Sequence, residues 1–470
     1  MSSAAAPAAA GAAASAGARR AAAPLRAVGR VRFRPATVLF TLAAFTSSFD
    51  IFLTLDVGFN FRIAQLFLGL AFLLALEDAR RRRARMPLGF GALCLWTAFI
   101  VAFVPNTTLL TRSAGYAFWL VFNVVVIFAA VQLFRRTDRL TTLLRWYLYS
   151  FAFCAAFGVV QLLVSVAGLG GPLVRQWWFV GVLPRVNGFS YEPSFYATYL
   201  LIGWTLALYL IEQRSYVLMP LPRLRAIFLG ITVALVISTS RMGWLMMGLW
   251  CSLYPLRLLW HLLHGRLHRR FLWYSLGIGA IGVAVAVVVI SVIGVDTLRF
   301  LVTGLGIGGA AEHSVSLRTK PFSDVLRVFA QSPIVGHSLG GVSPAIARLN
   351  GWTAGSLAAA KESEGINVFA EVLAGSGVIG VIPFVVYLAT LIWKPLRLAS
   401  RLADRDQRTL LRGMVAALLM ELVVLQFNQN ILRLYLWLHI ALLSALYAAL
   451  RAGRASDASG ARAPSAAAAA

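Results

Sequence analysis

Charged residues are scarce in this chain, and acidic ones are the scarcest. Of its 470 residues only 13% are charged, and just 17 residues are Asp or Glu. A soluble domain carries roughly 25% charged residues. Because 60% of the residues are hydrophobic, the composition excludes an ordinary water-soluble domain and favours a protein whose solvent is lipid.

Cysteines are also few, and the chain has no long basic face. Cys94, Cys154 and Cys251 lie in apolar blocks without paired spacing, so neither a disulfide framework nor a metal site is expected. The net charge of +26 could suggest nucleic acid. The arginines, however, occur in short clusters between apolar blocks and are not interleaved with aromatics, so no nucleic-acid partner is expected.

The two ends of the chain are poor in apolar runs. Residues 1–35 are Ala-rich, carry several arginines and contain no apolar run before Pro35, so we expect a disordered basic cytoplasmic tail and no cleavable signal peptide. Residues 455–470 predict a second disordered cytoplasmic tail. Between the tails, residues 36–450 are expected to form one transmembrane domain without a strong internal repeat.

Apolar blocks near the length that crosses a bilayer recur along that domain. They lie at about 36–55, 61–76, 87–104, 114–134, 143–167, 195–211, 226–240, 242–256, 271–295, 366–393, 410–426 and 433–450. The sequence therefore predicts an all-α polytopic membrane protein with about twelve transmembrane helices.

The distribution of basic residues predicts the orientation of these helices. With the N-terminus inside, 31 of the 43 Lys and Arg fall in inside segments. Six of the other twelve belong to one long outside loop, 296–365, and long loops are exempt from the positive-inside rule. We expect a multi-pass bacterial inner-membrane protein with both termini cytoplasmic and a periplasmic loop between helices 9 and 10.

Ionisable residues at membrane depth gather in the outer half of the predicted bundle. Asp50, Asp56, Glu421 and His439 lie near outer ends of spans, where a carboxyl group could cap or pair locally or take part in function. Arg241 stands between two apolar blocks of about 15 residues, and each reaches only about 22 Å at 1.5 Å per residue. It is expected below the outer surface, facing protein or water.

Three polar segments together resemble the O-antigen polymerase and O-antigen ligase superfamily of envelope glycosyltransferases. The first runs from Arg185 to Ala197 and contains Glu-Pro-Ser before an apolar span. The second is Ser238-Thr239-Ser240-Arg241. The third starts at Arg318, continues through Pro333 to Gly340, and ends with Asn367 and Gly377-Val378-Ile379-Gly380.

The resemblance implies transfer of glycan from an undecaprenyl-diphosphate carrier to an acceptor at the periplasmic face, without a metal, cofactor or nucleotide sugar. Many members carry His-Asn before the span that follows the long loop, but Ile366 stands at that His position here. The Glu-Pro-Ser segment looks more like the polymerases. We therefore expect polymerisation of lipid-linked oligosaccharide repeat units into O-antigen or exopolysaccharide.

The expected chemistry needs orientation and stabilisation of the charge that grows on the departing diphosphate. Arginine suits this because it donates two parallel hydrogen bonds to phosphate. We expect Arg185, Arg241 and Arg318 to converge on the diphosphate, with Glu192 as the first candidate for the base. The candidate substrate-binding residues are Asn187, Tyr191, Arg327, His337, Glu364 and Asn367, and Glu364 is also the second candidate for the base.

Two alternatives remain open. An O-antigen ligase would transfer the glycan to lipid A-core, although Ile366 weakens that interpretation. A lipid-linked oligosaccharide transporter would more typically show paired repeats and binding groups near the midplane. The expected partners are the lipid-linked donor and acceptor and membrane lipid, with a flippase and a chain-length regulator as further candidates.

Overall fold

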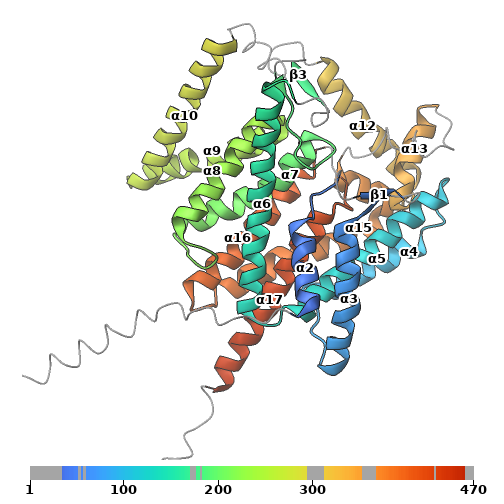
Figure 1. Ribbon diagram of the computed structural model, residues 1–470. Coiled ribbons are helices and arrows are strands. Elements are labelled where there is room, and N and C mark those ends of the chain that lie inside the picture. The colour runs from blue at the N-terminus through green and yellow to red at the C-terminus, as the bar shows by residue number, and fades with distance from the viewer. Residues whose placement is uncertain are drawn as a thin grey trace, which may run out of the picture. The chain divides into compact units, whose positions relative to one another are not determined.

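The computed structural model describes residues 34–50, 54–56, 60–169, 176–179, 183–293, 312–351, 367–427 and 430–460. The chain divides into two units, Met1–Pro35 and Ala36–Ala470, and the second contains the helical core. Helices dominate the described residues (Figure 1). The described strands form two short antiparallel hairpins, β1 Thr54–Asp56 with β2 Asn60–Arg62, and β3 Trp177–Phe179 with β4 Leu183–Pro184.

Each of the twelve predicted apolar blocks coincides with a helix in the described part of the chain. These helices are α2 Pro35–Phe45, α3 Ile63–Arg81, α4 Phe90–Ala102, α5 Leu110–Leu133, α6 Thr137–Val166, α7 Pro193–Glu212, α8 Leu221–Ile237, α9 Arg241–Leu263, α10 Arg269–Ile293, α15 Val368–Ala399, α16 Arg405–Val424 and α17 Leu434–Gly460.

Five of these helices are long and apolar enough to cross a membrane. They are α5, α6, α7, α15 and the part of α17 up to Ala455. Helices α2 and α4 are apolar but shorter, with 11 and 13 residues. The chain is thus an all-α membrane protein, while the count of twelve spans stays a prediction.

The predicted first block, 36–55, does not form one helix. Helix α2 ends at Phe45, and Asp50 lies beyond it with a buried carboxylate that pairs with the Arg62 guanidinium at 2.7 Å. The polar run Thr46–Asp50 stops the helix because its side chains bond locally, as Thr46 and Ser47 do to nearby carbonyl groups. The expected tail at 455–470 also begins later, since α17 continues to Gly460.

Helices α7 and α17 lie at the centre of the helical core. Helix α7 packs against α16 and α8, and α17 packs against α5 and α16. Large side chains such as Trp204 in α7 and Trp437 in α17 are almost fully buried. Glu192 and Arg433 directly precede these two buried helices.

Part of the expected long loop also has regular structure. It forms α12 Glu312–Gln331, the short 3₁₀ helix η2 Leu339–Gly341 and α13 Val342–Leu349. These pack against α15 through a small separate apolar cluster that includes Val325, Ile346 and Ala374. Residues 294–311 and 352–366 of this region, the chain up to residue 33 and residues 461–470 lie outside the described residues.

Candidate functional site

The loop Pro184–Ser194 is built around a buried amide network. The side-chain nitrogen of Asn187 donates to the carbonyl oxygen of Ser190, and its side-chain oxygen accepts from Gln161 Nε2 at 2.8 Å. Gln161 Oε1 in turn accepts from the backbone N–H groups of Asn187 and Gly188. Asn187 thus holds the turn in shape, and its expected contact with substrate stays a prediction.

Arg185 is half-buried at the start of this loop. Its backbone N–H donates to the Gln176 carbonyl oxygen at 2.9 Å, and its guanidinium donates to Gln176 Oε1 at 3.1 Å. Burial lowers the pKa of Arg185, the nearby charge of Arg241 lowers it further, and Glu192 opposes both. The charges of Glu192 and Arg241, which come from two separate motifs, therefore both reach Arg185.

Arg241 is the first residue of α9. Ser240 caps the helix by accepting from the Gly243 N–H at 3.4 Å. A cation is disfavoured at a helix N-terminus, where the unpaired N–H groups already carry partial positive charge. The side chain of Arg241 is exposed, and its expected depth below the outer membrane surface stays a prediction. A guanidinium accessible at this position can receive an anionic ligand.

The backbone just before Arg241 is strained. Thr239 has a φ of +51°, a left-handed conformation that β-branched residues rarely adopt, and its side chain is buried. Such outliers are of order 1–3 kcal/mol unfavourable and cluster at functional sites. Ser338, in the third motif, is a second non-glycine residue of this kind, with a φ of +65°.

Glu192 is the N-cap residue of α7, and Pro193 follows at the first helical position. Its carboxylate accepts a hydrogen bond from Ser194 Oγ at 3.0 Å. An acidic group is favoured there by the helix dipole, so Glu192 has a structural reason to be present beside its candidate catalytic one. Glu192 and its neighbour Tyr191 are partly exposed.

Beside the same turn of α7 lies a second arginine cluster that was not predicted from the sequence. Asp50 pairs with Arg62 at 2.7 Å and, more loosely, with Arg433 at 3.9 Å. The Arg433 guanidinium lies 3.4 Å from the ring centroid of Phe195, in the first turn of α7. Asp50 also donates its backbone N–H to the Phe189 carbonyl oxygen, which ties this cluster to the Pro184–Ser194 loop.

The sequence did contain a signal for this cluster. Both arginines stand at the first residues of predicted spans, where a basic residue is usually taken as an interfacial anchor. The presence of Asp50 at the outer end of another span could have suggested a shared partner. What the sequence did not show is that the three segments meet.

The third motif forms one docked unit. The Val378 N–H donates to the Pro333 carbonyl oxygen at 2.9 Å, and the His337 N–H donates to the Ala374 carbonyl oxygen at 2.9 Å. Helix α15 is interrupted at Gly377, whose φ is +61°. The interruption frees backbone groups of the helix, and the turn at 333–337 satisfies them.

Two side chains expected to bind substrate are engaged within this unit. Arg327 is 69% exposed and lies 3.8 Å from the carboxylate of Asp324 on the same helix. The Asn367 side chain caps α15 by accepting from the Ala370 N–H at 3.0 Å, and it donates to Gln426 Oε1 at 2.9 Å. The structure gives both residues local contacts, and their contact with substrate stays a prediction.

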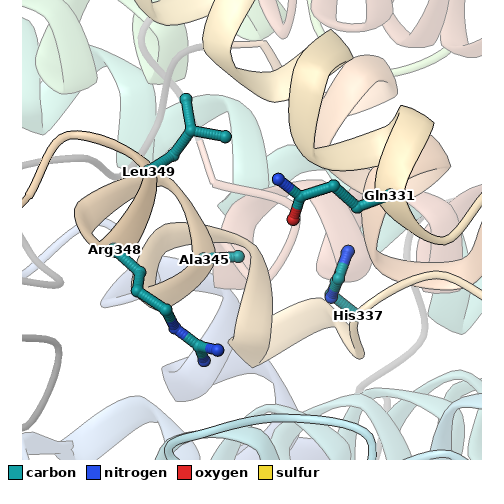
Figure 2. A pocket seen from close by; sticks show the side chains of 5 residues that line it. All are labelled: Gln331, His337, Ala345, Arg348 and Leu349. Carbon is teal, nitrogen blue, oxygen red and sulfur yellow. The ribbon is translucent and has the colours of Figure 1, made fainter.

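His337 lines a pocket of about 260 Å³ with Gln331, Ala345, Arg348 and Leu349 (Figure 2). One imidazole nitrogen, Nε2, lies 3.0 Å from the Val328 carbonyl oxygen. Burial lowers the pKa of His337, the bond to Val328 opposes this, and the charge of Arg348 lowers it further. This pocket is lined by residues from α12, α13 and the turn between them.

Two of the predicted site residues cannot be placed relative to the others. Arg318 belongs to α12, but its side chain lies outside the described residues, and Glu364 lies outside them altogether. Among the described residues, no group of three or more His, Cys, Asp and Glu side chains could hold a metal ion. Independence from metal stays a prediction.

The described geometry defines a candidate anion site. It combines Arg185, the Arg241 guanidinium at a helix N-terminus, and one carboxylate, Glu192, so positive charge exceeds negative charge. Such a site can hold a phosphate or diphosphate group. In comparisons with known proteins, no family model and no curated protein matches this chain.

Proposed function

We propose that this protein polymerises undecaprenyl-diphosphate-linked oligosaccharide repeat units into O-antigen or exopolysaccharide at the periplasmic face of the inner membrane. The observation that carries the proposal is that Arg185, half-buried in its loop, lies within electrostatic reach of both Arg241 and Glu192. Two guanidinium groups with one carboxylate leave a net positive charge, which a diphosphate ester would neutralise.

The proposed mechanism assigns separate tasks to these residues. Arg185 and Arg241 hold the diphosphate of the donor and stabilise the negative charge that grows as the glycosidic bond to phosphate breaks. Glu192 accepts the proton of the acceptor hydroxyl, which attacks the anomeric carbon. Arg318 and Glu364 are retained as candidates, together with the substrate-binding residues, in a multi-pass bundle of about twelve spans.

The all-α architecture with long apolar helices supports this proposal, because a lipid-linked substrate reaches its enzyme from the bilayer. Two of the three segments that resemble the polymerase and ligase superfamily supply the two arginines and Glu192. His337, in the third segment, is bonded to a backbone carbonyl group and lies in the pocket of Figure 2. This is compatible with a polymerase whose acceptor is another lipid-linked unit.

The deciding experiment adds purified full-length protein in detergent to lipid-linked repeat units, without nucleotide sugars or a membrane gradient. A polymerase produces a ladder of longer glycans on gel electrophoresis. Transfer only to added lipid A-core would identify a ligase, and the absence of any new glycosidic bond would contradict the enzymatic proposal.

A Glu192→Gln variant tests the assigned base. We expect it to bind lipid-linked substrate normally, because the amide keeps the shape of the side chain, but to turn over slowly. General-base assistance contributes roughly a hundredfold or more in rate. Turnover equal to that of the unmodified protein would remove Glu192 from the mechanism and leave it with a structural role at the start of α7.

A further inference from the structure

The cluster of Arg62, Asp50 and Arg433 carries a net positive charge, and its two arginines are more exposed to solvent than its acid. Two guanidinium groups share one described acid, Asp50, so the three together carry one positive charge in excess. The side chain of Asp50 is 3% exposed, whereas those of Arg62 and Arg433 are 19% and 13% exposed. The two arginines are therefore more accessible to a solute than the acid that pairs with them.

The contacts of Arg433 orient it for binding. Its guanidinium lies 3.4 Å from the ring centroid of Phe195, and this contact holds the group in one orientation. Its Nε is buried without a hydrogen-bond partner among the described residues, as is Asp50 Oδ2. The link between Arg433 and Asp50 is long, at 3.9 Å.

One other acid lies in this neighbourhood. Glu421 on α16 is buried. Its charge and the charges of the cluster all lie within electrostatic reach of Tyr435. Its two carboxyl oxygens form no hydrogen bond with the described residues, and it takes no part in their ion pairs. It does not compete for the donor atoms of Arg62 or Arg433.

The position of the cluster relates it to the candidate anion site. Phe195 donates its backbone N–H to the carbonyl oxygen of Glu192 in the first turn of α7. Asp50 holds Phe189, in the same loop as Arg185, through a backbone hydrogen bond of 3.1 Å. The cluster of Asp50, Arg62 and Arg433 is thus linked to the loop that carries Arg185 and to the helix turn that follows Glu192.

We propose that Arg62 and Arg433 form a second binding site for a phosphate or diphosphate group, with Asp50 as the counter-charge that holds them in place when the site is empty. This inference rests on the proposed function and deepens it: the second site takes the diphosphate of the other lipid-linked substrate. Its ligand class is a diphosphate ester of a lipid or free pyrophosphate, which present the same oxygen atoms.

The test measures binding of inorganic pyrophosphate and of undecaprenyl diphosphate to full-length protein in nanodiscs by isothermal titration calorimetry. We expect two sites per chain in the unmodified protein and one in an Arg433→Gln variant. Loss of a charged hydrogen-bond donor weakens the affected site roughly tenfold or more. Arg136→Gln is the matched control, because Arg136 is 71% exposed and pairs with Asp138.

Asp50→Asn separates a binding role from a structural one. Removing the counter-charge leaves both guanidinium groups free for a ligand, so we expect tighter pyrophosphate binding together with a lower midpoint of thermal unfolding. A purely structural cluster would lose stability without any gain in binding, and that result would overturn the proposal. Arg62→Gln replaces Arg433→Gln if the latter does not give monodisperse protein.

The two probes distinguish the sources of the phosphate group. Binding of pyrophosphate that depends on Arg433 shows that the diphosphate alone is recognised. Arg433-dependent binding of only undecaprenyl diphosphate shows that the lipid chain is needed as well. If neither depends on Arg433, the second site is disproved. Failure of the polymerisation assay with intact Arg433-dependent binding would instead disprove the proposed function alone.

Discussion

The Pro184–Ser194 loop and the region around α12 and α15 both supply residues expected in the site, but they use their polar groups differently. In the loop, Arg185 has a like-charged neighbour, Arg241, near enough to affect its pKa. Around α15, Arg327 pairs with Asp324 and Asn367 caps a helix. Polar residues that pair within their own region stabilise the fold around the candidate site, whereas the excess of positive charge in the loop is where we propose that the anionic ligand binds.

The largest expected effect is on the rate of polymerisation, and it comes from replacing the arginine of the loop or its neighbour Arg241. Arg185→Gln and Arg241→Gln should each lower the rate of polymerisation about a hundredfold, equivalent to ~3 kcal/mol. Because both act on one diphosphate, the double variant should lose much less than the product of the two single losses. Glycan ladders from equal amounts of purified protein measure the rates, and fully multiplicative losses would indicate separate roles.

The next largest effect concerns the break in α15. Gly377→Ala should destabilise the protein by about 1–3 kcal/mol, because a side chain is strained at a positive φ. An added Cβ would also come within 3.0 Å of backbone atoms of Ile334 and Val335. Gly115→Ala is the control, since a Cβ there has open space. Equal midpoints of thermal unfolding for the two variants would contradict this explanation.

A smaller effect is expected from His337. Burial puts its folded-state pKa below the ordinary 6.5, so protonation favours the unfolded or undocked state. The stability of the turn at 333–337 is therefore full above pH 6.5 and declines as the pH falls through the lowered pKa. Hydrogen exchange of this turn at about pH 7 and about pH 5 should show the decline, and His337→Gln should abolish it. An equal decline in the variant would assign the pH dependence to another group.

The smallest effect is expected for Arg327. Its pair with Asp324 is long and its side chain is 69% exposed, so Arg327→Gln should change the free energy of unfolding by no more than about 0.5 kcal/mol. Polymerisation should also stay within about twofold of normal. A loss comparable to that of Arg241→Gln would reverse the comparison and support the predicted contact of Arg327 with substrate.

Much of the helical architecture could be predicted because apolar blocks are a local signal. All twelve predicted blocks coincide with helices, with the largest error at 36–55, where the helix ends at Phe45. That error arose because Asp50 and its neighbours were counted within an apolar run. Thr46 and Ser47 bond to nearby carbonyl groups, and Asp50 pairs with Arg62. An ion pair between residues twelve positions apart leaves no signal in a hydropathy profile.

The candidate site could be predicted only in part. Arg185, Arg241 and Glu192 were selected from two separate motifs and do influence one another electrostatically. Arg62 and Arg433 were missed because their importance depends on three chain segments meeting beside Phe195. The local roles of Asn187 and Asn367 were also missed, since an Asn that caps a helix or closes a turn has the same sequence appearance as one that binds sugar.

The interruption of α15 at Gly377 has a consequence for how the protein is assembled during synthesis. Residues 333–337 leave the ribosome before α15, to which they hydrogen-bond. Their bonds can form only after α15 has been made and its own regular hydrogen bonding has been interrupted at Gly377. The amide protons of Val378 and Ile379, bonded to Pro333 and Ile334, are therefore natural reporters of maturation. Their slow exchange with solvent would appear only once the newly made chain has completed this junction.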